Sequence, residues 1–178
     1  MRIISGKYKG KRLIAPKKLP VRPTTDFAKE GLFNILTHRV DFDETSLLDL
    51  FSGTGNISYE FGSRGTEDIT SVDAHYGCVK YINTISEELD FSIKTVKCDV
   101  LKYLSSTPLT FDVIFADPPY SLDQLNFEAI VNKIFKRKLL NPEGLLIVEH
   151  SKHTDLSKNE YFTEARRYGG SIFSFFDL

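Results

Sequence analysis

The segment Asp117-Pro118-Pro119-Tyr120 joins an acid, two rigid residues and an aromatic ring directly after the apolar run FDVIFA. Proline supplies no ladder donor and restricts the residue before it, so a strand through this run must stop at the acid. The prolines fix the backbone, which lets the Asp117 carboxylate and the Pro118 carbonyl act as rigid acceptors. Two acceptors suit an exocyclic amine, and the Tyr120 ring suits a stacked base. The alternative is a structural turn, with Asp117 as a cap and Tyr120 as a lid over the core.

A pair of glycines follows another apolar run in the segment LLDLFSGTGN. Gly53 and Gly55 stand where a strand passes into a helix, and glycine lets the backbone approach a ligand closely. The third glycine of the dinucleotide fingerprint would fall at Ser58, and Asp49 would repel a pyrophosphate. A carboxylate at this place favours a cation. S-adenosylmethionine fits, because it has no phosphate and carries an ammonium and a sulfonium.

Two further acids end strand-like runs. Asp73 closes the run DITSV and can accept both ribose hydroxyls of a nucleoside, the task of an acid about 20 residues beyond such a loop. Asp99, in VKCDVL, is placed either to reach the adenine amino group of the cofactor or to cap the helix that follows. We expect Asp73 to bind the cofactor, and both readings of Asp99 stay open.

Charge is distributed unevenly along the chain. The net charge is −1, yet residues 1–22 hold eight Lys and Arg and no Asp or Glu, so the remainder has 15 basic and 24 acidic residues. A basic segment on an acidic domain is typical of a contact with a phosphate backbone, although solvated lysines would give the same pattern. The residues expected to contact RNA are Arg2, Lys7, Lys9, Lys11 and Arg12.

The elements that must position these residues follow from hydrophobic periodicity. Short apolar runs alternate with helix-length segments, which predicts βαβ units and a buried parallel sheet with its site at the carboxyl ends of the strands. Two strand-like runs joined at Gly169-Gly170 predict an antiparallel hairpin at the end of the sheet. Strands are expected over 47–51, 68–72, 93–96, 111–116 and 145–150, and helices over 57–63, 79–89 and 127–136.

Two elements precede this alternation. The segment RIISGKYKGKRLIAP predicts two short strands around a turn, which form a small basic hairpin. Thr24 or Thr25 can cap a helix through DFAKEGLFNIL. Its apolar residues recur at helical spacing and are Phe27, Leu32, Phe33, Ile35 and Leu36.

Composition restricts the class of protein. With 178 residues and 41% hydrophobic content, the chain is expected to form one domain, with a basic hairpin over 1–22 and a core over 23–178. Cys78 and Cys98 lie far apart, which favours reduced thiols over a disulfide or a zinc site. The four histidines show no ligand spacing, so no metal is expected. Without a long apolar run, we expect a cytoplasmic protein outside the membrane.

The motifs together resemble a known family. D-x-F-x-G-x-G followed by D-P-P-Y resembles the S-adenosylmethionine-dependent methyltransferases that modify amino groups of adenine or guanine. With MRIISGKYKGKRL, RPTTDFAKEGLFNIL, LLDLFSGTGNISYE, SRG and RRYGG, essentially the whole chain resembles the bacterial RsmD-type enzymes. These methylate a guanine N2 amine in small-subunit (16S) ribosomal RNA.

The resemblance implies an α/β fold of the Rossmann-like class I methyltransferases. Its mostly parallel seven-stranded sheet would carry a C-terminal antiparallel hairpin and a small basic N-terminal hairpin that contacts RNA. Asn56 departs from the family, which usually has a small apolar residue there. The catalytic corner would be Asp117, Pro118, Pro119 and Tyr120, and the cofactor pocket would comprise Arg22, Pro23, Thr24, Asp49, Phe51, Gly53, Gly55, Asp73 and Asp99.

We therefore expect a monomeric enzyme that methylates guanine N2 in small-subunit ribosomal RNA within an assembling particle. Adenine-N6 methylation of DNA or RNA is the alternative, because the acceptor corner does not distinguish the two amino-purines. A binding module for nucleic acid with an inactive cofactor pocket is the alternative from another class. The intact Asp117, prolines and Tyr120 count against it, as do Gly53 and Gly55.

Overall fold

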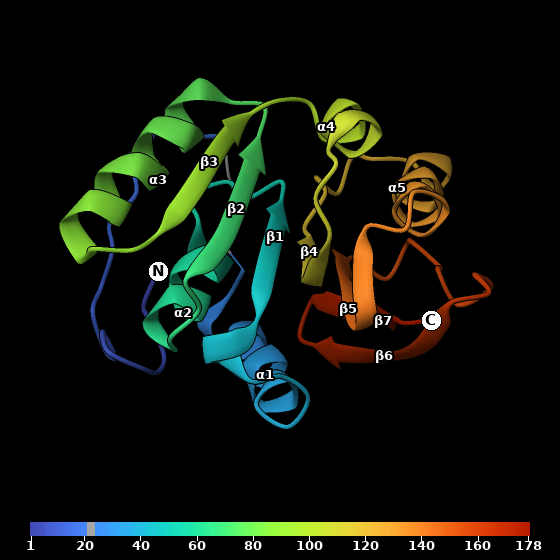
Figure 1. Ribbon diagram of the computed structural model, residues 1–178, viewed down its shortest axis with the longest axis horizontal. Coiled ribbons are helices and arrows are strands. Elements are labelled where there is room, and N and C mark those ends of the chain that lie inside the picture. Colours follow the sequence, from blue (N-terminus) through green and yellow to red (C-terminus); the bar gives the residue numbers. More distant parts are fainter. Residues whose placement is uncertain (21–23) are drawn as a thin grey trace.

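A computed structural model describes residues 1–20 and 24–178 and contains one seven-stranded sheet (Figure 1). The strands are β1 (Ser46–Leu50), β2 (Asp68–Asp73), β3 (Ile93–Lys97), β4 (Phe111–Ala116), β5 (Leu140–His150), β6 (Phe162–Tyr168) and β7 (Ser171–Phe176). Their order is β3-β2-β1-β4-β5-β7-β6; the first five are parallel, and β7 is antiparallel to both its neighbours. The predicted parallel sheet with an antiparallel hairpin at its end is confirmed.

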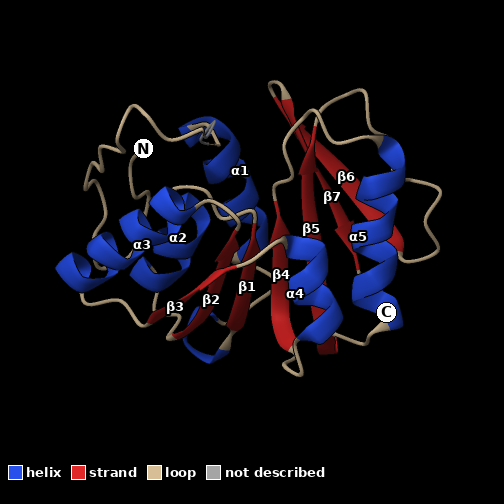
Figure 2. Cartoon of the chain, turned by 90° about the horizontal axis from the view of Figure 1, so that it is seen from above, coloured by secondary structure: helices blue, strands red, loops and turns tan. Residues whose placement is uncertain are grey.

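Helices cover both faces of this sheet. α1 (Asp26–Leu36), α2 (Asn56–Ser63) and α3 (Tyr76–Leu89) lie on one side, and α4 (Val100–Ser106) and α5 (Gln124–Lys136) lie on the other (Figure 2). A short 3-10 helix, η1 (Phe42–Glu44), leads into β1. Within the described residues, no helix is long and apolar enough to cross a membrane.

Strand alternation divides the core into two apolar layers. Leu48 and Ile114 face α4 and α5, whereas their neighbours Leu47 and Val113 face α1 and α2. Successive side chains in a strand point to opposite faces, so residues two apart share a layer. This parity decides which strand-end residues can meet.

β5 begins earlier than predicted. The expected run was 145–150, but the strand starts at Leu140, which pairs with Phe111 across an irregular register. The side-chain amide of Asn141 donates to Asp112 Oδ1 at 2.8 Å, which fixes this extension. Residues 141–144, Asn-Pro-Glu-Gly, are typical of a turn, so the sequence pattern placed the start of the strand too late.

α1 has the predicted bounds, and the predicted apolar residues Leu32, Phe33 and Leu36 are buried. Thr25 caps it, with its hydroxyl accepting from the Ala28 N–H at 3.2 Å. The prediction that Phe27 belongs to the apolar face is wrong, because Phe27 is 64% exposed. Lys29 is fully buried instead. Glu60, a charged partner inside the fold that the helical pattern does not show, explains the burial of Lys29.

The leading hairpin lacks the two strands that were predicted. Its two arms meet in one antiparallel bridge between Arg2 and Arg12, with Ile3 N–H donating to the Lys11 carbonyl at 3.0 Å. Several backbone donors near its tip turn to α2. Lys7 N–H, for example, donates to the Ser63 carbonyl at 2.6 Å. Bonds to a neighbouring helix thus replace the regular ladder of a hairpin.

Close packing holds this hairpin on the body of the protein. Gly6 adopts φ +79°, and a Cβ there would lie 1.7 Å from the Ser63 carbonyl oxygen, so only glycine fits. Burial of each large aliphatic side chain in the contact contributes about 1.5–3 kcal/mol. The apolar contact comprises Ile3, Leu13, Tyr59, Ile82, Ile85 and Leu89.

Candidate active site at the carboxyl ends of the strands

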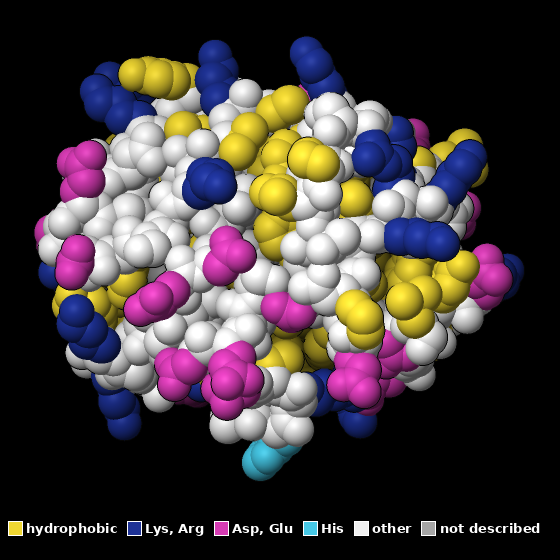
Figure 3. Space-filling view, in the orientation of Figure 1, with side chains coloured by type: hydrophobic (Ala, Val, Ile, Leu, Met, Phe, Trp, Pro, Cys, Tyr) yellow, Lys and Arg dark blue, Asp and Glu magenta, His cyan; other side chains and the backbone are white. Residues whose placement is uncertain are grey.

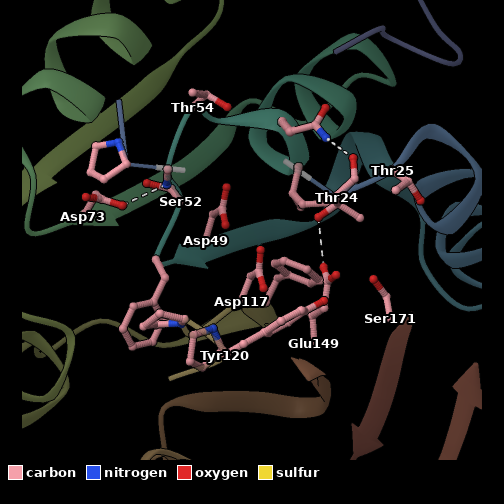
Figure 4. Close-up of a pocket in the computed structure, with 18 residues that line it drawn as sticks. Thr24, Thr25, Asp49, Ser52, Thr54, Asp73, Asp117, Tyr120, Glu149 and Ser171 are labelled. Carbon is pink, nitrogen blue, oxygen red and sulfur yellow. Dashed lines mark hydrogen bonds between the residues drawn. The ribbon is translucent and has the colours of Figure 1, made fainter. Parts of the chain in front are cut away.

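A cavity of about 440 Å³ opens where β1 and β4 end side by side (Figure 4). The chain leaves these two strands in opposite directions, which is the switch point where α/β sheets bind ligands. Asp117 closes the gap, since its N–H donates to the Leu50 carbonyl at 3.3 Å. The lining includes Pro20, Thr24, Thr25, Asp49, Phe51, Ser52, Gly53, Thr54, Asn56, Asp73, Asp117, Pro118, Pro119, Tyr120, Glu149 and Ser171.

Four carboxylates enter this cavity from four neighbouring strand ends. Asp49, Asp73, Asp117 and Glu149 come from β1, β2, β4 and β5. Strand registers pair Leu50 with Ala116 and Ala116 with Val148, so the acids share one face of the sheet, the face under α1 and α2. Such a concentration of negative charge favours a cationic ligand.

Backbone conformation shapes the loop after β1. Phe51 takes φ +56°, a left-handed conformation that is rare for a residue with a side chain, and this turns the chain sharply out of the strand. Gly53 N–H donates to Asp73 Oδ2 at 2.8 Å, which ties the loop to the end of β2. Gly55, at φ +81°, has no room for a Cβ, which would lie 2.7 Å from the Tyr59 ring. Gly55 thus shapes the loop without lining the cavity.

Asp49 is the most deeply placed acid of the loop. It is 2% exposed, and its Oδ2 accepts from the Ser58 hydroxyl at 2.5 Å. Burial raises the pKa of Asp49 to about 7, against the opposing effect of the bonds from Ser58. Among the described residues no Lys or Arg forms an ion pair with it. A bound cation would therefore stabilise its ionised form.

Thr24 forms the opposite wall and is held from two sides. Its hydroxyl donates to Glu149 Oε2 at 2.9 Å, and its carbonyl accepts from the Asn56 amide at 3.2 Å. Thr24 thereby connects the start of α1 with β5 and α2 (Figure 4). The predicted residues Arg22 and Pro23 lie outside the described residues.

Asn56, where the sequence departs from the family pattern, belongs to a buried polar network. Its Oδ1 accepts from Lys29 Nζ at 2.8 Å, and the same ammonium lies 3.3 Å from Glu60 Oε2 and 2.6 Å from the Arg2 carbonyl. Burial lowers the pKa of Lys29, and the neighbouring Glu60 opposes that shift. The network links the basic hairpin, α1 and α2 to the Thr24 wall.

Comparison with known proteins places this geometry in a family. A family model described as "Conserved hypothetical protein 95" matches residues 1–177. The Ribosomal RNA small subunit methyltransferase D of Haemophilus influenzae is 28% identical over 188 aligned positions, which cover 98% of this chain and 91% of that protein. The chain belongs to the RsmD family of methyltransferases. YlbH of Bacillus subtilis is 33% identical to this RsmD-family chain over 161 positions, or 88% of the chain and 85% of YlbH.

Solved structures confirm the Rossmann-like methyltransferase fold of the RsmD-family chain. A hypothetical protein from Thermus thermophilus matches with a TM-score of 0.85 at 24% identity, covering 100% of this chain and 99% of that one. The N-methyltransferase NodS of Bradyrhizobium japonicum, solved with S-adenosyl-L-homocysteine, matches with a TM-score of 0.65 at 17% identity, covering 85% and 87%.

S-adenosylmethionine is the cofactor of this RsmD-family chain, and the cavity fits it. The cavity has the size of a small-molecule site. Its buried Asp49 suits a cationic group, and Ser52 Oγ is buried without a hydrogen-bond partner among the described residues. An unsatisfied buried hydroxyl of this kind is costly unless a ligand satisfies it.

Several predicted residues lie elsewhere. Asp99 accepts from the Lys102 N–H at 3.0 Å as the N-cap of α4 and is exposed, outside the cavity lining. Two of the basic residues form ion pairs. Arg2 Nε lies 3.3 Å from Asp26, and Lys11 Nζ lies 2.7 Å from Glu88. Lys7, Lys9 and Arg12 are exposed and form no ion pair within the described part of the chain.

Several residues that line the cavity were not in the predicted site. Ser52 and Asn56 stand inside the glycine-loop segment, so their proximity to that motif was an available signal. Glu149 ends a predicted strand, and its acidic type at that place was a weak signal. Ser171 starts β7, and only the antiparallel pairing with β5 brings it here. No local pattern could have selected Ser171.

Proposed function

We propose that this chain transfers a methyl group from S-adenosylmethionine to the exocyclic N2 amine of a guanine in small-subunit ribosomal RNA. The supporting observation is the position of Asp117 and Pro118, which directly follow β4 and line the same cavity as Asp49 and the glycine loop. The groups proposed to accept hydrogen bonds from the amine and the carboxylate proposed to attract the cationic cofactor thus line the same cavity. The name of the Haemophilus influenzae relative supports ribosomal RNA as the substrate class.

The residues proposed to hold the cofactor come from β1, β2 and the wall above them. Asp49 would attract the cationic methionine end, with Thr24 opposite. Phe51 and Gly53 would present the turned loop, and Asp73 would meet the ribose. Ser52 joins this set because its buried hydroxyl lacks a described partner. Arg22 and Pro23 remain predictions, and for Asp99 the observed cap supports a structural role.

The catalytic corner acts on the nucleophile. When bound, S-adenosylmethionine would supply an electrophilic methyl group, with its sulfur keeping the electron pair of the broken carbon–sulfur bond as a neutral thioether and the proton from the methylated nitrogen passing to solvent. The lone pair of an aryl amine is delocalised into the ring, so the amine is a poor nucleophile. Acceptance of its N–H bonds by Asp117 and the Pro118 carbonyl favours a pyramidal nitrogen with a directed lone pair.

The turn after β4 keeps this corner rigid. Pro119 O accepts from the Leu122 N–H at 2.8 Å, whereas within the described chain no backbone N–H donates to the Pro118 carbonyl. The Pro118 carbonyl thus has acceptor capacity for a substrate. Tyr120 lines the cavity and is partly exposed, which suits stacking on a base that has left its helix.

Ribosomal RNA would reach this corner with help from the basic hairpin. Lys7, Lys9 and Arg12 are exposed and carry the charge that we assign to phosphate contacts. Arg2 and Lys11 are held in ion pairs and contribute through the position of the hairpin. We propose a monomer that acts in the cytoplasm on an assembling small-subunit particle.

Mapping of the modified nucleotide tests the proposal. Small subunits purified from a strain that lacks the gene would be treated with the enzyme and S-adenosylmethionine, and the RNA would be digested and analysed by mass spectrometry. We expect N2-methylguanosine at one position. N6-methyladenosine would overturn the assignment of the base, and failure to bind S-adenosylhomocysteine in calorimetry would overturn the enzyme assignment.

Substitution of the acceptor tests the mechanism. Asp117→Ala should lower turnover by at least about 10²-fold, because preorganised groups at the reacting atoms contribute on that order. Binding of S-adenosylhomocysteine should persist. Asp123→Ala is the matched control, since Asp123 caps α5 outside the cavity. Activity of Asp117→Ala equal to that of the control would contradict the assigned role.

A further inference from the structure

Glu149 is a buried carboxylate beside the catalytic corner for which the proposed mechanism has no task so far. It is 2% exposed, ends β5 and lines the cavity. Ala116 pairs with Val148 in the parallel ladder, so Asp117 and Glu149 are the next residues on adjacent strands. Adjacent strands lie about 4.8 Å apart, and these side chains share a face. Figure 4 shows the two acids next to each other in the cavity.

A second contact fixes the orientation of this carboxylate. The Thr24 hydroxyl donates to Glu149 Oε2 at 2.9 Å, and Thr24 is itself held by Asn56. A carboxylate has about four lone-pair sites, so these two oxygens can accept additional donors. Glu149 is thus an oriented acceptor at a subsite next to Asp117.

Two acceptors side by side match one edge of guanine. Its exocyclic N2 amine is adjacent to the N1–H, so these two neighbouring positions both present donors, with the O6 acceptor beyond them. The exocyclic amine of adenine is adjacent to an N1 lone pair, which a carboxylate repels. An enzyme that acts on a flipped base reads it through hydrogen bonds to the Watson–Crick edge. Resting on the proposed function, we propose that Glu149 accepts the N1–H of the target guanine and so selects guanine over adenine.

Asp117 and Glu149 together would distinguish guanine from adenine, which the acceptors Asp117 and Pro118 alone do not. Asp117 and Pro118 contact the amine, which both purines possess, whereas Glu149 contacts the ring nitrogen, which differs between them. A site built to hydrogen-bond a substrate group rejects analogues that lack it by large factors, because its buried polar group is left unpaired. Glu149 is therefore a specificity-determining residue.

The decisive substrate is RNA in which 2-aminopurine replaces the mapped target guanine. This base keeps the exocyclic N2 amine but has an N1 lone pair in place of the N1–H. For the wild-type protein, kcat/KM should fall by about 10²-fold or more relative to guanine, since one oriented hydrogen bond is replaced by repulsion. Glu149→Gln keeps an acceptor for Thr24 and adds an N–H that can donate to the lone pair. The variant should therefore reduce the preference for guanine at least about tenfold.

Binding provides a readout that does not depend on turnover. The fluorescence of 2-aminopurine rises when the base leaves its stack, so titration with protein reports capture of the base. Glu149→Gln should bind this RNA more tightly than the wild-type protein does. Ser171→Ala is the matched control, because Ser171 lines the same cavity and should leave the guanine preference unchanged.

The outcomes separate this inference from the proposed function. If replacement of guanine by 2-aminopurine lowers kcat/KM by the same factor in the wild-type protein and in Glu149→Gln, Glu149 has a structural role and the inference is wrong. If Glu149→Gln does not fold, Glu149→Asp replaces it and must retain the guanine preference that Glu149→Ala loses. If the wild-type protein methylates an adenine in unmodified subunits, both proposals are wrong. Guanine methylation with an unchanged preference in all variants overturns only the role of Glu149.

Discussion

The protonation state of Asp49 should make the affinity for the cationic cofactor depend on pH. Because burial raises its pKa to about 7, the free site is half protonated near neutral pH. The cationic ends of S-adenosylmethionine and its demethylated product favour the ionised form, so cofactor affinity should fall as pH decreases. With a free pKa of about 7, we expect about fivefold weaker binding at pH 6 than at pH 7. Calorimetry with S-adenosylhomocysteine measures this.

The matching control is Asp49→Asn, which should bind weakly and with little pH dependence in this range. An unchanged slope in this variant would assign the titration to another group. The effect of Asp49 on the stability of the free protein depends on pH in the opposite direction. Between pH 3.8 and about 7 the folded state holds a proton that the unfolded chain has lost, so the contribution of Asp49 to stability decreases as pH rises through this range.

At the scale of elements, the hairpin, α1 and α2 depend on one buried ion pair. Ile4 and Ser5 N–H donate to Glu60 at 2.8 and 3.0 Å, and Lys29 neutralises the same carboxylate. Lys29→Met should therefore destabilise the fold by up to about 3–5 kcal/mol, since it removes one of the two cations beside the buried Glu60 and leaves only Arg64, whose Nε lies 3.0 Å from Glu60 Oε1. Urea unfolding measures the loss, and hydrogen exchange at Ile4 and Ser5 shows whether the hairpin loosens first.

A double substitution separates the pair from its surroundings. Lys29→Met combined with Glu60→Gln should be less destabilised than the sum of the two single variants, because neither charge is then left alone. Arg39 and Glu164 form an exposed ion pair elsewhere, and Arg39→Met should cost about 1 kcal/mol or less. Additive effects of Lys29→Met and Glu60→Gln would contradict the coupling.

At the scale of the whole molecule, exposed acidic side chains gather at the end opposite the cavity. Figure 3 shows Asp and Glu side chains gathered over the lower part of this face, below the ends where β1 and β2 begin. Exposed acids at those ends are Asp41, Asp43, Glu44, Glu67 and Asp68. The cavity lies at the opposite ends of the same strands. The tip of the basic hairpin lies at the acidic end as well, because the Lys7 N–H donates to the Ser63 carbonyl at the end of α2.

Replacement of Lys7, Lys9 and Arg12 by Gln should weaken binding of a 16S fragment and make it less sensitive to salt. Each lost phosphate contact lowers the slope of log affinity against log salt by about 0.7 to 0.9, so we expect a change of about 2 to 3. Fluorescence anisotropy at several salt concentrations measures it. Gln at Lys94, Lys136 and Lys138 makes the same change in charge at exposed positions away from the hairpin. If the two triple variants had equal slopes, Lys7, Lys9 and Arg12 would make no specific phosphate contacts and would contribute only to solubility.

The sequence predicts those features that a local pattern encodes. Asp49, Asp73 and Asp117 each end an apolar run, so parallel strands alone place them at one edge of the sheet. Lys29 and Phe27 are different, because the choice between them depends on where Glu60 lies in the folded chain. Their burial follows from a contact between helices that no periodicity contains. Ser171 likewise reaches the cavity only through the long-range pairing of β7 with β5.

The hydrogen bond between Thr24 and Glu149 of β5, with Ser171 nearby, determines when the site can form during translation. The cavity needs a residue ahead of α1 and one at the start of the last strand, so most of the chain must leave the ribosome before the pocket closes. A nascent chain that lacks β7 has no complete site for the methyl donor. Each newly made enzyme therefore becomes competent only late in its own synthesis.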